Sequence, residues 1–507
     1  KHTQAQSRKD PLPFNPPRLM TPTLMRLFMF AKFCCMFSAV AERLPYSTGP
    51  GYTFDHFKAD FGRSYGDAEE HGLRSALFEA RMREIREHNA KGLSWTKGVN
   101  HLTDWTATEL QGLMGYRPSR SLGTSSLMET SEQSCMQASA TCVGVDSSCC
   151  SGLICGSSGA CEEIRSKESV DYTLDMPTSS RIMDQGPCGS CWAVATAGAL
   201  EAHAALYAKR KNLVFDRQLS PQALLSCTQN PHNCGGTGGC HGATGELALE
   251  SLVRGDGALR YGVLPVDLRA YTAKAVSCDS LATTSLRSPP SVRISGWKKL
   301  PANDPKAMMD ALANVGPLVA SVAGNGLHQY GSGIIGTDID DWILNHAVVM
   351  MGYGHDASLG KHYWKVRNSW GPLWGEGGHF RVERFAPFAE KPSGLDKKPG
   401  EGVACQDAHG KYPDTLTYSG VLAILGDTVH PVNLSVDARL MKPSTMLQKE
   451  AETTAASTED LEWCNTQCQR FAMDDLKERF NRDFGSDPSA CMVSCSQADG
   501  LGLFAKS

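Results

Sequence analysis

Several stretches of the chain show a clear pattern of apolar and polar positions. Residues 25–41 form an apolar run broken by Lys32, and residues 193–210 are rich in alanine and leucine with a basic end, which predicts a helix. Residues 343–351 form a strand-like apolar run around one histidine, and residues 362–367 read as a second strand, HYWKVR. Helices and strands are therefore both expected, in an α+β protein.

A further helix and a further strand are predicted between residues 51 and 117. Five positions at spacings of four, four, seven and four share one helical face: Glu70, Arg74, Phe78, Ile85 and Asn89. Four later positions alternate as in a strand: Gly98, Asn100, Leu102 and Asp104. This segment is therefore expected to form a small module of its own.

The bulk composition narrows the class of protein. The chain has 507 residues, 41% of them hydrophobic and 21% charged, so it can bury a large core and is expected to hold several domains. Its formal net charge is -4 and no basic stripe is present, which argues against nucleic-acid binding.

The apolar run at residues 25–41 is interpreted as a signal peptide. It begins with a basic residue and closes on the small residues Ala39-Val40-Ala41. Its uninterrupted apolar part is only nine residues long, too short to span a bilayer, so a cleaved signal is favoured over a membrane anchor. Residues 1–24 are a leader without a readable signal.

The cysteine count agrees with a secretory protein. Removal of Cys34 and Cys35 with the signal leaves seventeen of nineteen cysteines, and one nucleophile among them leaves an even sixteen to pair. That density indicates an oxidising compartment. We expect a lysosomal, vacuolar or extracellular location.

Candidate chemistry begins where the alanine-rich helix begins. The stretch 185–193 reads QGPCGSCWA, which places Cys191 at a helix N-terminus, where the unpaired N–H groups and the positive end of the helix dipole favour a thiolate. Gly189 allows close backbone approach, and Gln185 offers a side-chain N–H to a developing oxyanion.

The partners of this cysteine are predicted far downstream. His346 lies in the apolar run 343–351, and Asn368 and Trp370 follow HYWKVR. His346 would stabilise the thiolate and protonate the leaving amine, Asn368 would orient the imidazole, and Trp370 would shield their hydrogen bond. A lone histidine in an apolar run is usually a core residue, but three motifs in this order favour catalysis.

These motifs resemble the papain and cathepsin L family of cysteine peptidases: QGxCGSCWA at 185, NHAV at 345 and NSWGxxWGExG at 368. The resemblance implies a papain-like two-lobed fold at residues 166–434, with a helical left lobe and a β-barrel-like right lobe. It implies an endopeptidase that acts on peptides and proteins through a thioester, without cofactor or metal. It also implies roles for Gln185, Cys191, His346 and Asn368 in catalysis and for Gly242, Thr244, Trp370 and Asp427 in substrate binding.

The resemblance also implies two disulfides, Cys188 with Cys240 and Cys227 with Cys278, and the absence of the family's third. Two cysteines of the domain are then unassigned. We predict that Cys234 and Cys405 pair and hold an insertion at residues 387–417 beside the cleft; the alternative is two separate thiols.

By the same alignment, Asp427 falls at the floor of the S2 pocket, which takes P2, the second substrate residue before the scissile bond. A buried carboxylate there would pair with a cation, so the hypothesis is that P2 arginine or lysine is accepted. The competing interpretation turns Asp427 to solvent.

Residues 51–117 resemble the inhibitory propeptide of the same family, with Arg81 and Leu102 replacing an asparagine and a phenylalanine. The propeptide would block the cleft until removed, and low pH would loosen it by protonating carboxylates such as Asp104. An ordinary amphipathic helical domain is the alternative.

Two cysteine-rich modules remain. Residues 135–161 hold six cysteines in 27 residues, which resembles an inhibitor cystine knot and would act as a spacer or bind an unidentified ligand. A polar linker is expected at 435–460. A CX3C-X22-CX3C pattern at 461–497 favours a disulfide-stapled helical hairpin over zinc. Asn433 begins a glycosylation sequon.

The expected function is that of a cysteine endopeptidase made as an inactive precursor and activated by propeptide removal at acidic pH. The alternative is a protease inhibitor or binding protein that works through the propeptide-like and knot modules. Intact Gln185, Cys191, His346 and Asn368 favour the enzyme.

Overall fold

The computed structural model describes residues 51–116, 153–155, 161–163, 167–174, 176, 178, 181–281, 288–386 and 390–443. The leader, the signal segment, the hairpin and most of the knot module and of the linker lie outside these residues. Two short antiparallel strands are described at the end of the predicted knot module, β2 (Leu153–Cys155) within it and β3 (Cys161–Glu163) from its last residue onward. Among the described helices, none is long and apolar enough to cross a bilayer.

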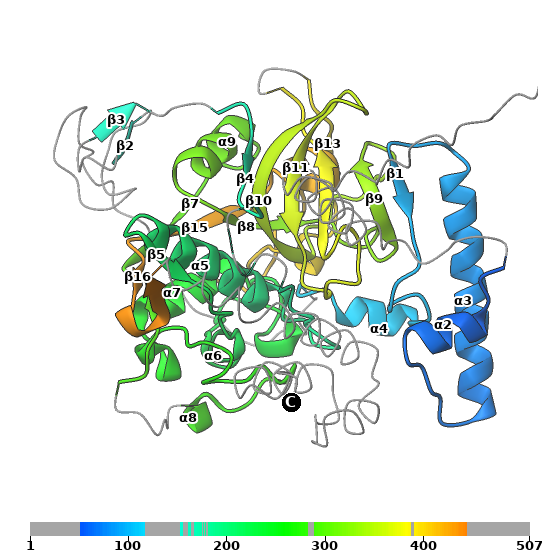
Figure 1. The fold of residues 1–507 in the computed structure, drawn as a ribbon, viewed down its shortest axis with the longest axis horizontal. Helices are drawn as coiled ribbons and strands as arrows, with labels where there is room; N and C mark the ends of the chain where they lie inside the picture. Colours follow the sequence, from blue (N-terminus) through cyan, green and yellow to red (C-terminus); the bar gives the residue numbers. More distant parts are fainter. Residues whose placement is uncertain are drawn as a thin grey trace, which may run out of the picture. The chain divides into compact units, whose positions relative to one another are not determined.

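The helical part of the peptidase region is built around α5 (Cys191–Lys209). Most of its side chains are buried, as expected for a helix that is apolar on nearly every face. The other helices of this part are α6 (Gln222–Cys227), α7 (Gly245–Arg254), α8 (Cys278–Leu281), η1 (Gly239–His241) and η2 (Gly257–Tyr261). Helices α6 and α7 contact α5, and α8 contacts α6, apart from the long strands (Figure 1).

The second part is a mixed sheet, in which the described strands follow the order β1-β9-β12-β11-β10-β8-β15-β7, with β4 also paired to β10. Their bounds are β1 (Trp95–Lys97), β4 (Val170–Asp171), β7 (Gly296–Lys299), β8 (Leu318–Val322), β9 (Tyr330–Ile335), β10 (His346–Asp356), β11 (Lys361–Arg367), β12 (His379–Glu383) and β15 (Thr428–Val432). Helix α9 (Pro305–Asn314) precedes β8.

Register within this sheet sets up the site. Strand β10 is antiparallel to β11, with Val349 opposite Arg367. The start of β10 and the end of β11 therefore meet at one end of the sheet. His346 is the first residue of β10 and Asn368 follows the last residue of β11, so both predicted residues lie there.

The polar linker predicted at residues 435–460 starts later in the structure than predicted. Strand β16 (Ser435–Val436) pairs with β6 (Val292–Arg293), and β17 (Met441–Pro443) pairs with β5 (Leu213–Phe215), with η5 (Ala438–Leu440) between them. Val436 and Leu440 are buried against the helical part. Residues 435–443 thus belong to the peptidase domain, because two short strand pairings and two apolar anchors outweigh their polar composition.

The insertion predicted at residues 387–417 contains regular secondary structure. Its elements are β13 (Ser393–Asp396), η3 (Pro399–Glu401), β14 (Leu416–Ser419) and, just after it, η4 (Val421–Ala423). Cys234 and Cys405 form a disulfide, the pairing expected above, and the 188–240 and 227–278 disulfides are also present. Backbone hydrogen bonds from Gly235 to Ala404 (3.1 Å) and from Gln406 to His232 (2.9 Å) accompany the new bridge. The insertion is therefore fastened to the helical part.

The propeptide-like segment contains α2 (Phe54–Asp60), α3 (Ala68–Asn89) and α4 (Ala107–Gly112). Phe78 and Ile85 of the predicted stripe are buried. A guanidinium on that stripe holds two elements together, because Arg74 donates to both carboxylate oxygens of Glu109 at 2.6 and 2.7 Å.

The strand of this segment lies earlier than predicted. Residues 95–97 form β1, which pairs antiparallel with β9, Trp95 lying opposite Gly333. The expected strand at 98–104 is wrong: the side chain of Asn100 accepts from Leu102 N at 2.8 Å and folds the chain into turns. Local side-chain hydrogen bonding has overridden the alternating pattern.

Candidate active site

Cys191 occupies the first position of α5. Its side chain is buried, it stands outside the three disulfides of the described residues, and Sγ accepts a hydrogen bond from the backbone N–H of Ala347 at 3.2 Å. Since Ala347 directly follows His346, this bond brings the helix start and the first residue of β10 into contact. The sulfur therefore lies where the unpaired N–H groups of α5 stabilise negative charge.

His346 and Asn368 are hydrogen bonded to one another. His346 Nε2 lies 2.7 Å from Asn368 Oδ1, and the same oxygen accepts from the backbone N–H of Ser369 at 2.8 Å. Because Oδ1 can only accept, Nε2 carries the hydrogen, and Nδ1 of the neutral ring is left as a base. Trp370 covers this pair, with its ring centroid 4.7 Å from that of His346.

Burial keeps the imidazole neutral in this state. It lowers the pKa of His346 to about 4, outweighing the hydrogen bond to Asn368, which acts to raise it. Among the described residues, Nδ1 of His346 has no hydrogen-bond partner although it is buried. Nδ1 is therefore available to accept a proton.

The side-chain amide of Gln185 is held in one orientation. Ser369 Oγ donates to its Oε1 at 2.6 Å, so Nε2 must be the donor end. Nε2 donates to the carbonyl oxygens of Cys188 and Leu113, both at 2.8 Å. Gln185 thus presents a fixed N–H donor near the start of α5.

The acceptor at Leu113 belongs to the propeptide-like segment, which runs through the site. A Cβ atom on Gly115 would lie 2.2 Å from Cys191 Sγ, so only glycine allows this approach. Gly242, at φ +97°, leaves room in the same way, since its Cβ would meet Gly115 O at 2.0 Å. The segment therefore covers the sulfur and the expected substrate-binding glycine at once.

Thr244 has a structural role in addition to any contact with substrate. Its side chain caps α7 by accepting from Leu247 N at 3.3 Å, and the residue is fully buried. Its expected role in substrate binding stays a prediction.

Asp427 is buried, so the interpretation that it turns to solvent is wrong. The residue is 7% exposed, and its Oδ1 lies 3.1 Å from Lys299 Nζ. The sequence predicted that a cation pairs with Asp427 and assigned that cation to the substrate. In the structure the cation is Lys299 of the chain itself. Lys299 reaches Asp427 because β7 pairs with β15, a pairing that no local sequence signal announces.

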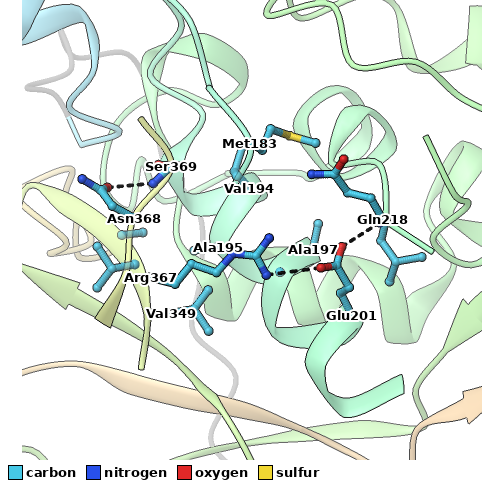
Figure 2. Close-up of a pocket in the computed structure, with 14 residues that line it drawn as sticks. Met183, Val194, Ala195, Ala197, Glu201, Gln218, Val349, Arg367, Asn368 and Ser369 are labelled. Carbon is cyan, nitrogen blue, oxygen red and sulfur yellow. Dashed lines mark hydrogen bonds and ion pairs between the residues drawn. The ribbon is translucent and has the colours of Figure 1, made fainter. Parts of the chain in front are cut away.

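A buried ion pair lies behind the site. Arg367, the last residue of β11, donates to Glu201 of α5 at 3.2 Å, and Glu201 also accepts from Leu219 N at 3.0 Å. Figure 2 shows Arg367 and Glu201 pointing toward one another in the pocket that Asn368 and Ser369 also line. The pair fixes α5 to β11, and with them Cys191 to Asn368.

Histidine, cysteine, aspartate and glutamate side chains do not gather as a metal-ligand set anywhere in the described ranges. The side chains gathered at Cys191 supply a thiol, an imidazole and amide donors, which are groups suited to acyl transfer.

Comparison with protein families gives two matches. Residues 166–392 match the model described as papain family cysteine protease, and residues 54–110 match the cathepsin propeptide inhibitor domain (I29). The match to the propeptide model covers most of residues 51–116 and ends just before residues 113–116, which cross the site.

Curated relatives agree with these matches. Ananain of Ananas comosus is 29% identical over 72% of this chain and 92% of its own length. Vignain of Vigna mungo is 36% identical over 40% of this chain and 51% of its own. The comparisons give no support to the inhibitor or binding-protein alternative.

Solved structures agree on the fold. A procathepsin L2 proteinase from the Tenebrio molitor larval midgut has a TM-score of 0.51 at 22% identity, over 75% of this chain and 98% of that one. A recombinant stem bromelain precursor has a TM-score of 0.50 at 24% identity, over 75% of this chain and 97% of that one. The fold is papain-like with a propeptide, and the chain is a member of the papain family of cysteine proteases, made as a zymogen.

Proposed function

We propose that Cys191, His346, Asn368 and Gln185 form the catalytic site of this endopeptidase. Two hydrogen bonds carry the proposal. The backbone N–H of Ala347 donates to Cys191 Sγ, and His346 Nε2–H donates to Asn368 Oδ1. Together these bonds bring the thiol of Cys191 and the side-chain amide of Asn368 to the start of β10, where His346 lies.

The proposed reaction begins with proton transfer from Cys191 Sγ to Nδ1 of His346, which the Asn368 bond leaves unprotonated. The thiolate attacks the scissile carbonyl carbon, and the Gln185 Nε2–H and the Cys191 backbone N–H bind the oxyanion. The C–N bond then breaks as Nδ1 gives its proton to the leaving amine, which leaves a thioester. Water hydrolyses the thioester, with Nδ1 again taking and returning a proton.

Latency follows from the position of the propeptide. Its Leu113 carbonyl accepts from the Gln185 donor, while Tyr116, three residues later, lies beyond Cys191. A substrate with its scissile carbonyl at Gln185 would place its preceding residues on the Tyr116 side. The propeptide therefore runs in the opposite direction to a substrate and offers Cys191 no correctly oriented peptide bond.

The test is activation of the full-length precursor beside a Cys191→Ala variant. Both are shifted from about pH 7 to about pH 4.5, which spans the ordinary pKa values of histidine and the carboxylates. Peptidase activity and intact mass are then followed. We expect the wild type to lose its propeptide and become active, and Cys191→Ala to do neither.

A matched control separates catalysis from folding. Cys191→Ala and wild type should unfold at the same urea concentration, because a small buried thiol is removed without loss of a disulfide. Activity in Cys191→Ala, or inactivity of a folded wild type after its propeptide is gone, would contradict the proposal.

The remaining modules are assigned by proposal. We assign residues 25–41 to a signal peptide, residues 135–161 to a spacer or ligand-binding knot and residues 461–497 to a helical hairpin. We also propose that the enzyme enters the secretory pathway and acts in a lysosome, in a vacuole or outside the cell. The three disulfides support an oxidising compartment. Asn433 of the sequon is exposed, which suits glycosylation.

A further inference from the structure

Tyr116 fills a pocket beside the candidate nucleophile. It is 2% exposed, and its ring packs on Gly235, where a Cβ atom would come 2.5 Å from Tyr116 Cδ1. The residue before it, Gly115, lies against both Cys191 and Gly242. The propeptide thus presents a tyrosine to the pocket expected to take the P2 side chain.

The hydroxyl group of Tyr116 ends on a directed chain of hydrogen bonds. It lies 3.0 Å from Ser321 Oγ, and Ser321 Oγ donates to Asp427 Oδ2 at 2.6 Å. The ionised carboxylate only accepts, so the hydrogen of Ser321 is committed to Asp427. Tyr116 is therefore the donor, and the pocket presents a hydrogen-bond acceptor to whatever side chain enters it.

Lys299 occupies the other oxygen of Asp427. Its Nζ lies 3.1 Å from Asp427 Oδ1 and also contacts Glu246 Oε1. Burial raises the pKa of Glu246, and the charge of Asp427 raises it further, so a proton or a nearby cation is favoured there. Lys299 supplies that cation from within the chain. The Lys299 side chain is 47% exposed, so a P2 arginine or lysine would have to push it toward solvent or share the site with a like charge, and either is unfavourable.

We propose that the enzyme selects tyrosine at P2 through Ser321, and that Lys299 is the residue that closes this pocket to arginine and lysine. The inference rests on the proposed function, because it concerns substrates of the Cys191 peptidase. It replaces the hypothesis that Asp427 accepts a basic P2 residue.

The test uses the enzyme activated from its full-length precursor, with active sites counted by an irreversible thiol-directed inhibitor. Four peptides that differ only at P2 (tyrosine, phenylalanine, leucine, arginine) are compared by kcat/KM. We expect tyrosine to exceed phenylalanine by about tenfold, the effect of one hydrogen bond to a buried acceptor. Arginine should fall about tenfold or more below leucine.

Two variants assign these effects to residues. Ser321→Ala should bring the tyrosine to phenylalanine ratio close to one. Lys299→Met should raise kcat/KM for the arginine peptide about tenfold or more, because Asp427 and Glu246 then lack their cation. Lys298→Met is the matched control, since it removes the same charge from the neighbouring position of β7, whose side chain points to the other face. It should leave all four ratios unchanged.

The outcomes distinguish this inference from the proposed function. Phenylalanine equal to tyrosine, or an arginine rate that Lys299→Met does not change, overturns the inference while the peptidase stands. No cleavage of any of the four peptides by a folded, processed enzyme overturns both. The precursor offers a second readout: Tyr116→Phe should hasten processing at neutral pH, and an unchanged processing rate would contradict the role given to Ser321.

Discussion

Gln185 and Leu113 are joined by a hydrogen bond of 2.8 Å, from the side-chain amide of the one to the main-chain carbonyl of the other. The donor proposed to stabilise the transition state is therefore occupied by the propeptide in the precursor. In the proposed mechanism, catalysis and latency would use the same N–H group.

Gln185→Ala should reduce kcat of the activated enzyme by about 10²–10³, the effect of removing one oxyanion donor. KM should change little, since this N–H acts mainly on the charged intermediate. The exposed Gln229→Ala is the control and should keep full kcat. A loss confined to KM would show that Gln185 binds substrate without stabilising the oxyanion.

His101 should contribute to acid activation. It is 5% exposed and lies 3.5 Å from Asp184 of the peptidase domain. Burial lowers the pKa of His101 and Arg63 adds to this, while Asp184 and Asp104 oppose it. Because the docked pKa lies below that of a free imidazole, docking is stable at higher pH and weakens as pH falls below about 6.5.

His101→Gln should therefore flatten the dependence of processing rate on pH between about pH 7 and about pH 5. Initial rates of propeptide release from the full-length chain measure this. The control is His71→Gln, an exposed histidine of α3 whose ring packs on Phe54 and Tyr65 within the propeptide itself. Identical pH profiles for His101→Gln and wild type would contradict a role for His101.

Arg74 and Glu109 should hold the propeptide in its docked form. Burial raises the pKa of Glu109, but hydrogen bonds from Arg74 and Thr106 outweigh it and lower the pKa to about 2. This stabilisation is present above the ordinary carboxylate pKa and is lost as pH falls toward 2.

Arg74→Met should cost about 1 kcal/mol of propeptide stability, since the pair is partly exposed, and speed processing at neutral pH about fivefold. Arg83→Met, on the exposed face of the same helix, is the control and should behave as wild type. Equal processing rates for the two variants would contradict this role for the pair.

Glu201 and Arg367 should matter for stability, because each is nearly inaccessible to solvent. Glu201→Gln would leave a buried guanidinium without its counter-ion and should lower the free energy of unfolding by about 3–5 kcal/mol in urea. Replacing both residues by methionine should cost less than the sum of the single changes. The control is Glu401→Gln, which removes a partly exposed surface pair with Lys398 and should cost under about 0.5 kcal/mol.

Much of the site was predictable from the sequence because its chemistry lies in short motifs. Cys191 could be placed at the start of α5 from the alanine-rich run that follows it, and His346 at the start of a buried strand from its apolar neighbours. Once the family resemblance had assigned the other cysteines of the domain, their parity suggested that Cys234 pairs with Cys405, as it does.

The rest depends on contacts between distant segments. Lys299 reaches Asp427 only through strand pairing, and composition alone could not show that residues 435–443 return to the domain. A weak signal for Ser321 did exist, as the single hydroxyl in the apolar stretch LVASV of β8. A polar residue in a fully buried strand needs a partner, and here that partner is Asp427.

Strand β9 has a second consequence once the enzyme is mature. In the precursor its backbone pairs with β1, and Ile334 N donates to Ser94 O at 2.7 Å. Removal of the propeptide leaves β9 as an open sheet edge with unpaired N–H and C=O groups. Gly331 and Gly333 give that edge no side chains to obstruct it. Open edges of this kind are general sites for strand addition, so activation would expose backbone groups that the precursor keeps paired.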